Sequence, residues 1–185
     1  MNGNLHIVHR RRAAPVDLDC LRRFIRCLLR DALHEEDFDL GICLVGAKEM
    51  ARLNETFLRH QGPTDVITFD YADKAGRASR LSRCPLGPDG RDARPALYGE
   101  IVICVDRAVV QARRFRTSWQ SELARYLIHG VLHLRGFDDR RPAGRRRMKR
   151  EEDRLLRQLG RRFALSTLAG DGRSRRACAI VNHNS

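Results

Sequence analysis

Three short apolar segments constrain the fold of this chain more than any other feature. They are FDLGICLVG at 38–46, DVITFDY at 65–71 and GEIVICVD at 99–106. Short apolar runs that are rich in β-branched and aromatic residues and bounded by turn-forming residues are typical of buried strands. A shorter candidate strand spans residues 5–8. The sequence therefore predicts a small sheet whose strands come from the first two thirds of the chain.

Helical periodicity occupies the segments before and between these strands. Asp17 can cap a helix whose apolar residues, from Leu21 to Ala32, follow a three-four spacing. Residues 47–58 place Met50 and Phe57 on one face of a second helix.

Three further helical patterns follow the last strand, at 107–115, 118–135 and 143–159. Thr117 and Gln120 resemble a capping box at the start of the middle one. Strands followed by helices predict the α+β class, with a small mixed β-sheet packed with helices.

The length of 185 residues suits one domain with a substantial core. We expect this domain over residues 1–160, and a flexible C-terminal extension at 161–185, where the helical period is lost. Residues 72–98, rich in Gly, Pro and Arg, predict a long mobile loop.

Composition indicates a cytoplasmic protein without a membrane segment. No apolar run is long enough to span a bilayer, and the N-terminus lacks the pattern of a signal peptide. The six cysteines are scattered without a CxxC pair, so most are expected to be small core residues in a reducing compartment.

The net charge of +13 favours a polyanionic partner, of which nucleic acid is the commonest in the cytosol. Of the 36 basic residues, 33 are arginine and three are lysine. Such a bias can reflect the base composition of the genome as well as selection for a ligand. Charge alone leaves RNA and DNA open.

HGVLHLRGFDD at 129–139 carries the most specific chemical pattern. His129 and His133 are four residues apart, so on a helix their Cβ atoms lie about 5 to 6 Å apart on one face. Gly136 can end the helix in a left-handed conformation and return the chain over that face. Asp139 or Asp138 can then be the third ligand. Three protein ligands with an open position are typical of catalytic zinc.

Two other interpretations of the histidines stay open. They can be buried core histidines, because the rest of the helix is apolar and imidazoles there need polar partners. The spacing is also that of the metzincin protease motif HExxHxxGxxH. However, Gly130 replaces the glutamate that deprotonates the metal-bound water in those proteases.

Three segments together resemble the YbeY family of metal-dependent endoribonucleases. HGVLHLRGFDD, followed by a helix with Met148, Glu151 and Glu152, is similar to the family signature HGxLHLxGYDH. LNETFLRHQGPTDVITF at 53–69 is similar to LNxxYRxxDxPTDVLSF, and LYGEIVICVDRAVVQA at 97–112 is similar to the LGDIVIS segment. The resemblance covers roughly residues 38–160.

The resemblance implies a small α+β fold, one zinc ion per chain, and cleavage of single-stranded RNA. It also implies a role in 16S rRNA 3′-end maturation and ribosome quality control, with rRNA and the small ribosomal subunit as partners. His129 and His133 match the first two family ligands, and the third family histidine falls on Asp139. Aspartate can bind zinc, but its charge makes the metal a weaker Lewis acid. Asp138 matches the family's own aspartate and is expected in the turn or in orienting the ligands.

A second departure from the family concerns the arginine of its RNA site, whose position holds Leu58 here. Arg59 is the catalytic candidate in its place, but adjacent helix positions point about 100° apart, so the helix must end or turn there. Thr64 and Asp65 are expected either at the edge of the cleft or in a simple turn before a strand. Glu122 could face the site as a general base or form a surface salt bridge.

The predicted function is a single-strand-specific endoribonuclease with His129, His133 and Asp139 as metal ligands. A non-catalytic ribosome assembly factor with a structural metal is the alternative from another class. A structural zinc would need a fourth ligand, and the nearest downstream candidates are Cys178 and His183. A metalloprotease is the third possibility, against which Gly130 argues.

Overall fold

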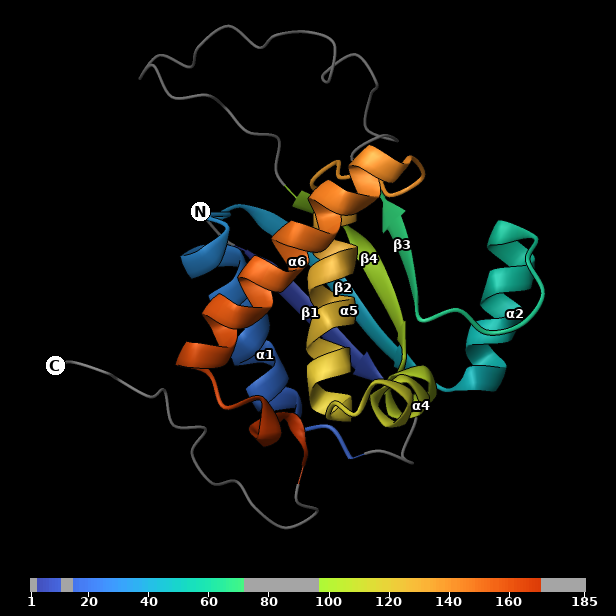
Figure 1. Cartoon of the computed structure of the whole chain (residues 1–185), viewed down its shortest axis with the longest axis horizontal. Coiled ribbons are helices and arrows are strands. Elements are labelled where there is room, and N and C mark those ends of the chain that lie inside the picture. Colours follow the sequence, from blue (N-terminus) through green and yellow to red (C-terminus); the bar gives the residue numbers. More distant parts are fainter. Residues whose placement is uncertain (1–2, 11–14, 72–96, 171–185) are drawn as a thin grey trace, which may run out of the picture.

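The computed structural model describes residues 3–10, 15–71 and 97–170, in which a mixed four-stranded sheet is the central element (Figure 1). The strands are β1 (Asn4–His9), β2 (Phe38–Val45), β3 (Val66–Asp70) and β4 (Leu97–Cys104). Their order is β1-β2-β4-β3, with β1, β2 and β4 parallel and β3 antiparallel to β4. The predicted α+β class and mixed sheet are confirmed.

The helices cover the two faces of the sheet unequally. They are α1 (Leu18–Arg26), its π-helical continuation η1 (Cys27–Ala32), α2 (Ala47–Leu58), α4 (Val105–Phe115), α5 (Trp119–Leu134), α6 (Pro142–Arg162) and the 3₁₀ turn η2 (Leu165–Leu168). In Figure 1, α1, α5 and α6 lie together over one face, while α2 stands apart beyond β3. α5 lies in the middle of the larger layer.

Alternation along the strands divides the core into two parts. In β2, Leu40, Ile42 and Leu44 face the large cluster formed with α1, α5 and α6. Cys43 and Val45 face a smaller cluster under α2. This is the period-two pattern of a strand covered on both faces. It explains why the second half of β2 is apolar at every position.

Two glycines let α5 lie close against β4. A Cβ on Gly130 would come within 2.6 Å of Ile101 Cγ2, and a Cβ on Gly99 within 2.5 Å of Leu134 Cδ2 and 2.6 Å of the Phe69 carbonyl oxygen. Real side chains do not approach so closely, so both positions require glycine at this helix-sheet distance. The close packing brings the histidine face of α5 alongside β3.

The predicted N-cap is correct for α1 and wrong for α5. Asp17 caps α1 as predicted, since its carboxylate accepts hydrogen bonds from the Asp19 and Cys20 amides. The predicted capping box at Thr117 is wrong. Ser118 is the N-cap of α5, and its hydroxyl accepts a hydrogen bond from the Ser121 amide. The Thr117 hydroxyl instead donates a hydrogen bond to Glu122 Oε1 at 2.6 Å.

The C-terminal part of the described chain is packed into the core. Of the predicted extension at 161–185, the structure describes residues up to 170. Phe163 and Leu168 are buried, and Ala169 forms a β-bridge with Val16. The packed domain therefore reaches at least residue 170. Within the predicted loop at 72–98, residues 97 and 98 belong to β4, and the rest lies outside the described residues.

The cysteines that the structure describes lie inside the domain as thiols and not in disulfides. Cys20, Cys43 and Cys104 are buried and Cys27 is half-buried. Burial raises the pKa of the Cys27 thiol to about 11 and also raises the pKa of Cys43 and Cys104. These thiols are therefore protonated at neutral pH and act as small apolar residues. Among the described helices, none has both the length and the apolar character that a bilayer crossing requires.

Candidate metal centre

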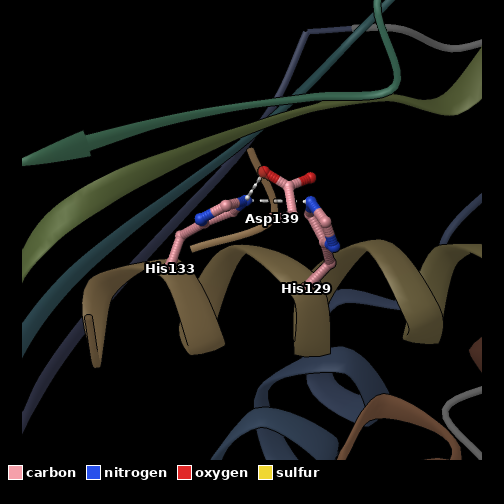
Figure 2. A group of neighbouring side chains, drawn as sticks. All are labelled: His129, His133 and Asp139. Atoms are coloured by element: carbon pink, nitrogen blue, oxygen red, sulfur yellow. Dashed lines mark hydrogen bonds and ion pairs between the residues drawn. The ribbon is translucent and has the colours of Figure 1, made fainter. Parts of the chain in front are cut away.

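His129 and His133 project from one face of α5 toward each other (Figure 2). Their Nε2 atoms are 3.1 Å apart, and their ring planes cross at 85° with centroids 4.6 Å apart. Both side chains are 29% exposed. They are therefore accessible from the surface, unlike the fully buried residues of the same helix.

A hydrogen bond on the other nitrogen fixes the orientation of each ring. His133 Nδ1 lies 3.0 Å from the Phe137 carbonyl oxygen, which can only accept, so this nitrogen carries the proton. His129 Nδ1 lies 2.6 Å from Glu152 Oε1, a carboxylate oxygen on α6. A metal-binding histidine is usually held by such a carbonyl or carboxylate on its second nitrogen. In the neutral form of each ring, Nε2 is thereby left as an acceptor.

The facing Nε2 atoms fit a bound cation. Two nitrogen lone pairs repel each other at 3.1 Å unless a proton or a metal ion lies between them. A tetrahedral zinc ion, with Zn–N of about 2.0 to 2.1 Å, would hold two nitrogens about 3.3 Å apart. The distance between the histidines matches this value closely.

The imidazole of His133 is poised as a neutral ligand. Burial lowers the pKa of His133 below its usual value, and the neighbouring His129 lowers it further. A neutral ring is the form that binds metal. Proton loss is therefore no barrier to metal binding at His133 near neutral pH.

Asp139 supplies the third donor. Its Oδ1 lies 4.0 Å from His133 Nε2, and the donor atoms of His129, His133 and Asp139 all lie within 4.8 Å of one another. Among the residues that the structure describes, this group can hold a metal ion. Figure 2 shows the carboxylate above the two rings.

A tight helix end brings Asp139 to this position. Gly136 is left-handed with φ of +83°. The Phe137 amide donates to the Leu132 carbonyl and the Gly136 amide donates to the His133 carbonyl, which is the Schellman pattern. The left-handed conformation predicted for Gly136 is confirmed. The same turn also points the Phe137 carbonyl back at His133.

Asp138 has a different part in this turn. Its Oδ1 accepts a hydrogen bond from the Arg140 amide at 3.0 Å and its side chain faces solvent. Such a bond from an aspartate to the amide two residues later stabilises a turn. Asp138 therefore supports the segment that positions Asp139, in line with the turn role expected for it.

Two pockets meet at the histidines. One, of about 310 Å³, is lined by Leu58, Val66, Ile67, Thr68 and Asp70 in addition to the histidines. The other, of about 470 Å³, is lined by Thr64, Asp65, Val66, Arg125, Tyr126, Asp139 and Glu152 in addition to the histidines. The metal centre thus lies between two hollows. This position leaves room for a chain-like ligand on both sides.

Each pocket contains a hydroxyl group without a partner. Thr68 Oγ1 and Tyr126 Oη are buried and form no hydrogen bond with any described residue. Burial raises the pKa of Tyr126 above its usual value, and the nearby Asp65 raises it further. The Tyr126 hydroxyl is therefore protonated and can donate. Buried polar groups left unpaired are uncommon, and a water or a ligand in the cleft can complete their hydrogen bonds.

Leu58 and Arg59, at the end of α2, have different positions relative to the pockets. Leu58 lines the smaller pocket, whereas Arg59 is exposed and lines neither pocket. Arg59 is the C-cap of α2 and adopts a left-handed conformation with φ of 57° and ψ of 29°. The helix therefore does end at this point, which was the condition for Arg59 to turn toward the cleft. Thr64 and Asp65 line the larger pocket, as expected for residues at the cleft edge.

Neither position 130 nor Glu122 faces the three donor residues. Gly130 is buried against Ile101 of β4, so a side chain at 130 would enter the core instead of the cleft. Glu122 is buried and accepts a hydrogen bond from the Thr117 hydroxyl, and it lines neither pocket. Neither the proposed base role nor the surface salt bridge suggested for Glu122 fits this position. Position 130 cannot provide the base of a metzincin protease.

Several site residues were missed from the sequence. Glu152 is 23 residues from His129 and meets it because α6 packs on α5. Its buried carboxylate also lies 3.8 Å from both Arg125 and Lys149. The one sequence signal was a glutamate on the helix after the motif. Tyr126, three residues before His129, looked like an ordinary core residue.

Comparisons with known proteins place the chain among relatives of one kind. A family model described as Endoribonuclease YbeY matches residues 7–160. A protein of Chlorobium luteolum with that name is 40% identical over 123 residues, which are 66% of this chain and 75% of the relative. One from Salinibacter ruber is 32% identical over 152 residues, or 82% of this chain and 89% of the relative. One from Myxococcus xanthus is 34% identical over 143 residues, or 77% of this chain and 43% of the relative. The chain thus spans less than half of that last protein.

The fold has a counterpart among solved structures. The solution structure of TM1509 from Thermotoga maritima matches with a TM-score of 0.55 and 21% identity, covering 92% of this chain and 99% of that protein. Fold and site together define a small α+β protein in which two histidines of the central helix and an aspartate that follows it form a group that can hold a metal ion. This chain belongs to the endoribonuclease YbeY family. The resemblance seen in its three motifs is confirmed.

The third donor can be tested by a pair of neighbouring substitutions. Asp139→Ala is expected to weaken zinc binding by about 10-fold to 100-fold, because one of three donors is lost. Asp138→Ala is the matched control. This variant should retain its metal, because the Asp138 carboxylate accepts a hydrogen bond from the Arg140 amide and is not one of the three donors. Metal content after dialysis at fixed free zinc measures both. Loss of zinc from the second variant alone would show that Asp138 is the ligand.

Proposed function

We propose that this protein is a metal-dependent endoribonuclease that cleaves single-stranded RNA. Its expected setting is the cytoplasm, where it acts in 16S rRNA 3′-end maturation and ribosome quality control together with the small ribosomal subunit. Membership of a family named for an endoribonuclease supports the reaction class. The assignment to rRNA follows from the same resemblance.

The observation that carries this proposal is the donor group at the junction of two pockets. The Nε2 atoms of His129 and His133 and the carboxylate of Asp139 converge where both pockets begin. A structural zinc would normally be closed by four protein ligands, most often including cysteine. Three donors beside open space favour an ion that is accessible to a substrate.

A zinc ion held by these donors would supply Lewis-acid chemistry to a phosphodiester or to the attacking water. The protein's own residues prepare the site for it. Glu152 and the Phe137 carbonyl hold the two rings with Nε2 toward the cleft. These preset orientations reduce the reorganisation needed when substrate binds.

Other residues of the cleft are suited to hold an RNA strand on either side of the reacting phosphate. The Tyr126 hydroxyl can donate to a phosphate or sugar oxygen in the larger pocket. The Thr68 hydroxyl and the apolar side of Leu58 can contact a base or sugar in the smaller one. Arg59, exposed at the end of α2, is proposed to contact a phosphate at the cleft edge.

Single-stranded RNA is the favoured substrate form. A single strand can splay its bases into a cleft, whereas a duplex keeps them stacked and paired. The net charge of +13 attracts the phosphates. Binding should weaken with salt, with a slope of about −0.7 in log K against log salt for each phosphate neutralised.

The test is cleavage of one RNA in two forms by the purified full-length protein. We expect the zinc-loaded protein to cleave the single strand at internal positions and to leave the same sequence largely intact in a duplex. Treatment with a chelator should abolish cleavage, and added zinc should restore it. Gel analysis of end-labelled RNA gives the products.

Two results would contradict the proposal. Zinc-loaded, folded protein that leaves single-stranded RNA intact would favour the assembly-factor alternative. Cleavage that persists after complete metal removal would separate the activity from the His129, His133 and Asp139 group. A casein assay run in parallel should stay negative, because Gly130 offers no base.

A further inference from the structure

Five exposed arginines form a stripe along the outer side of α6. At about 100° per residue they fall within about 80° of arc and span about 22 Å of helix. The arginine stripe consists of Arg146, Arg150, Arg154, Arg157 and Arg161. The buried side chains of the same helix, on the opposite side, are Met148, Glu152, Leu155 and Leu159.

The stripe has few carboxylates of its own. Glu151 binds Arg154, Glu152 faces His129, and Asp153 binds Arg125 and Lys149. All three acidic residues of α6 are thus engaged. Within the described part of the chain, the other four stripe arginines form no ion pair. Like charges three and four residues apart on a helix destabilise it, and a bridging anion would relieve this repulsion.

A hollow follows the C-terminal half of the stripe. It has a volume of about 440 Å³ and is lined by Arg154, Arg157, Gln158, Arg161 and Arg162. Planar guanidinium groups bind phosphate through paired hydrogen bonds. Four arginines around one hollow, only two of them paired with carboxylates, offer such a site to a phosphate-bearing ligand.

General arginine bias does not by itself produce this arrangement. The outer side of α2 mixes both signs, with Lys48 and Arg52 beside Glu49 and Glu55. On α6 the five stripe arginines are accompanied by two partly exposed carboxylates, Glu151 and Asp153, so positive charge predominates along the helix. The difference between two helices of the same chain points to a function of α6.

The stripe is also connected to the metal centre. α6 begins at Pro142, soon after Asp139, and Arg145 Nε donates a hydrogen bond to the Asp139 carbonyl oxygen at 3.2 Å. From there α6 runs obliquely across α5 and away from the site (Figure 1). A strand that leaves the cleft past Asp139 meets the start of this surface.

We propose that the arginine stripe of α6 is a second RNA-binding surface, which holds the phosphates of the strand outside the cleft. This inference rests on the proposed function for the identity of the polyanion. The proposed surface is distinct from the cleft, since the stripe lies on the side of α6 that faces away from His129 and His133. Its expected effect is on long substrates and not on the chemistry.

The test compares two triple variants that lose the same charge. Arg150, Arg157 and Arg161→Gln removes three stripe residues and keeps helix propensity. Arg52, Arg113 and Arg114→Gln is the matched control on the exposed sides of α2 and α4. Binding of a fluorescent single-stranded RNA of about 20 nucleotides is followed by anisotropy with a chelator present. Cleavage of RNAs of about 4 and about 20 nucleotides is measured with zinc, because strand-binding sites cover about 4 to 16 nucleotides.

We expect the stripe variant to bind the long RNA about tenfold more weakly, with a salt slope smaller by about 2, and the control variant to change little. Cleavage of the short RNA and zinc content should match those of the unmodified protein in both variants. Equal weakening by the two triples, or none by the stripe triple, would overturn the inference. If the stripe substitutions weaken binding of the long RNA but the unmodified protein cleaves neither RNA, the proposed endoribonuclease function is wrong and the RNA-binding role of the stripe is supported.

Discussion

Replacing Gly130 by glutamate is expected to lower the free energy of unfolding by about 3 kcal/mol or more, and in the limit to prevent folding. The new Cβ would lie 2.6 Å from Ile101 Cγ2, so α5 would have to move off β4. Its carboxylate would then lie among apolar residues without a partner, which is the costliest way to bury a charge. Urea denaturation gives the change in stability from the transition midpoint.

Gly160→Glu is the matched control for this substitution. Gly160 is also helical, but it is exposed on α6, and a Cβ built there would have nothing within 4 Å apart from its chain neighbours and the local helix backbone. Its stability should be unchanged or higher by up to about 0.5 kcal/mol, because glycine is a poor helix former. A Gly130→Glu protein with an unaltered midpoint would show that position 130 faces the cleft, and it would reopen the protease interpretation.

His133→Ala is expected to remove bound zinc and to lower RNA cleavage by at least about 100-fold. The substitution leaves two of three donors, and it also removes the ring that the Phe137 carbonyl holds in place. Because the His133 side chain is 29% exposed, the fold should tolerate its loss. Metal analysis and cleavage of single-stranded RNA are measured on the same preparation, with circular dichroism to verify folding.

The control for this experiment is His6→Ala. His6 is exposed on β1, which forms the opposite edge of the sheet from β3. Its loss should change neither zinc content nor cleavage. Equal metal and equal cleavage in the His133→Ala protein would mean that the paired histidines have no part in either property, and the central proposal would then be wrong.

Local patterns in the sequence predicted the parts of the molecule that local physics determines. Short, nearly continuous apolar runs located β2 and β4, and the four-residue spacing placed His129 and His133 on one face. Gly136 predicted the end of α5 because only a left-handed residue allows that turn. These features depend on neighbours within about one helical turn.

The rest of the site depends on contacts between distant segments. Glu152 reaches His129 only through the packing of α6 on α5, and Thr68 reaches the same cleft through β3. No spacing rule links residues on separate elements. The start of α5 was misplaced by one residue because Thr117 and Ser118 are both good caps, and the hydroxyl of Thr117 is used by Glu122.

The two rings of the metal centre are held by bonds of different range. His133 is fixed by the carbonyl of Phe137, four residues later in the chain, while His129 is fixed by the Glu152 side chain of another helix. Detachment of α6 would therefore free one ligand and spare the other. If zinc binds more tightly when both rings are held, zinc binding must stabilise the packing of α6 on α5 by the same free energy. Bound zinc would then stabilise the contact between α5 and α6. Amide hydrogen exchange in α6 would be slower in the zinc-bound protein than in the metal-free protein.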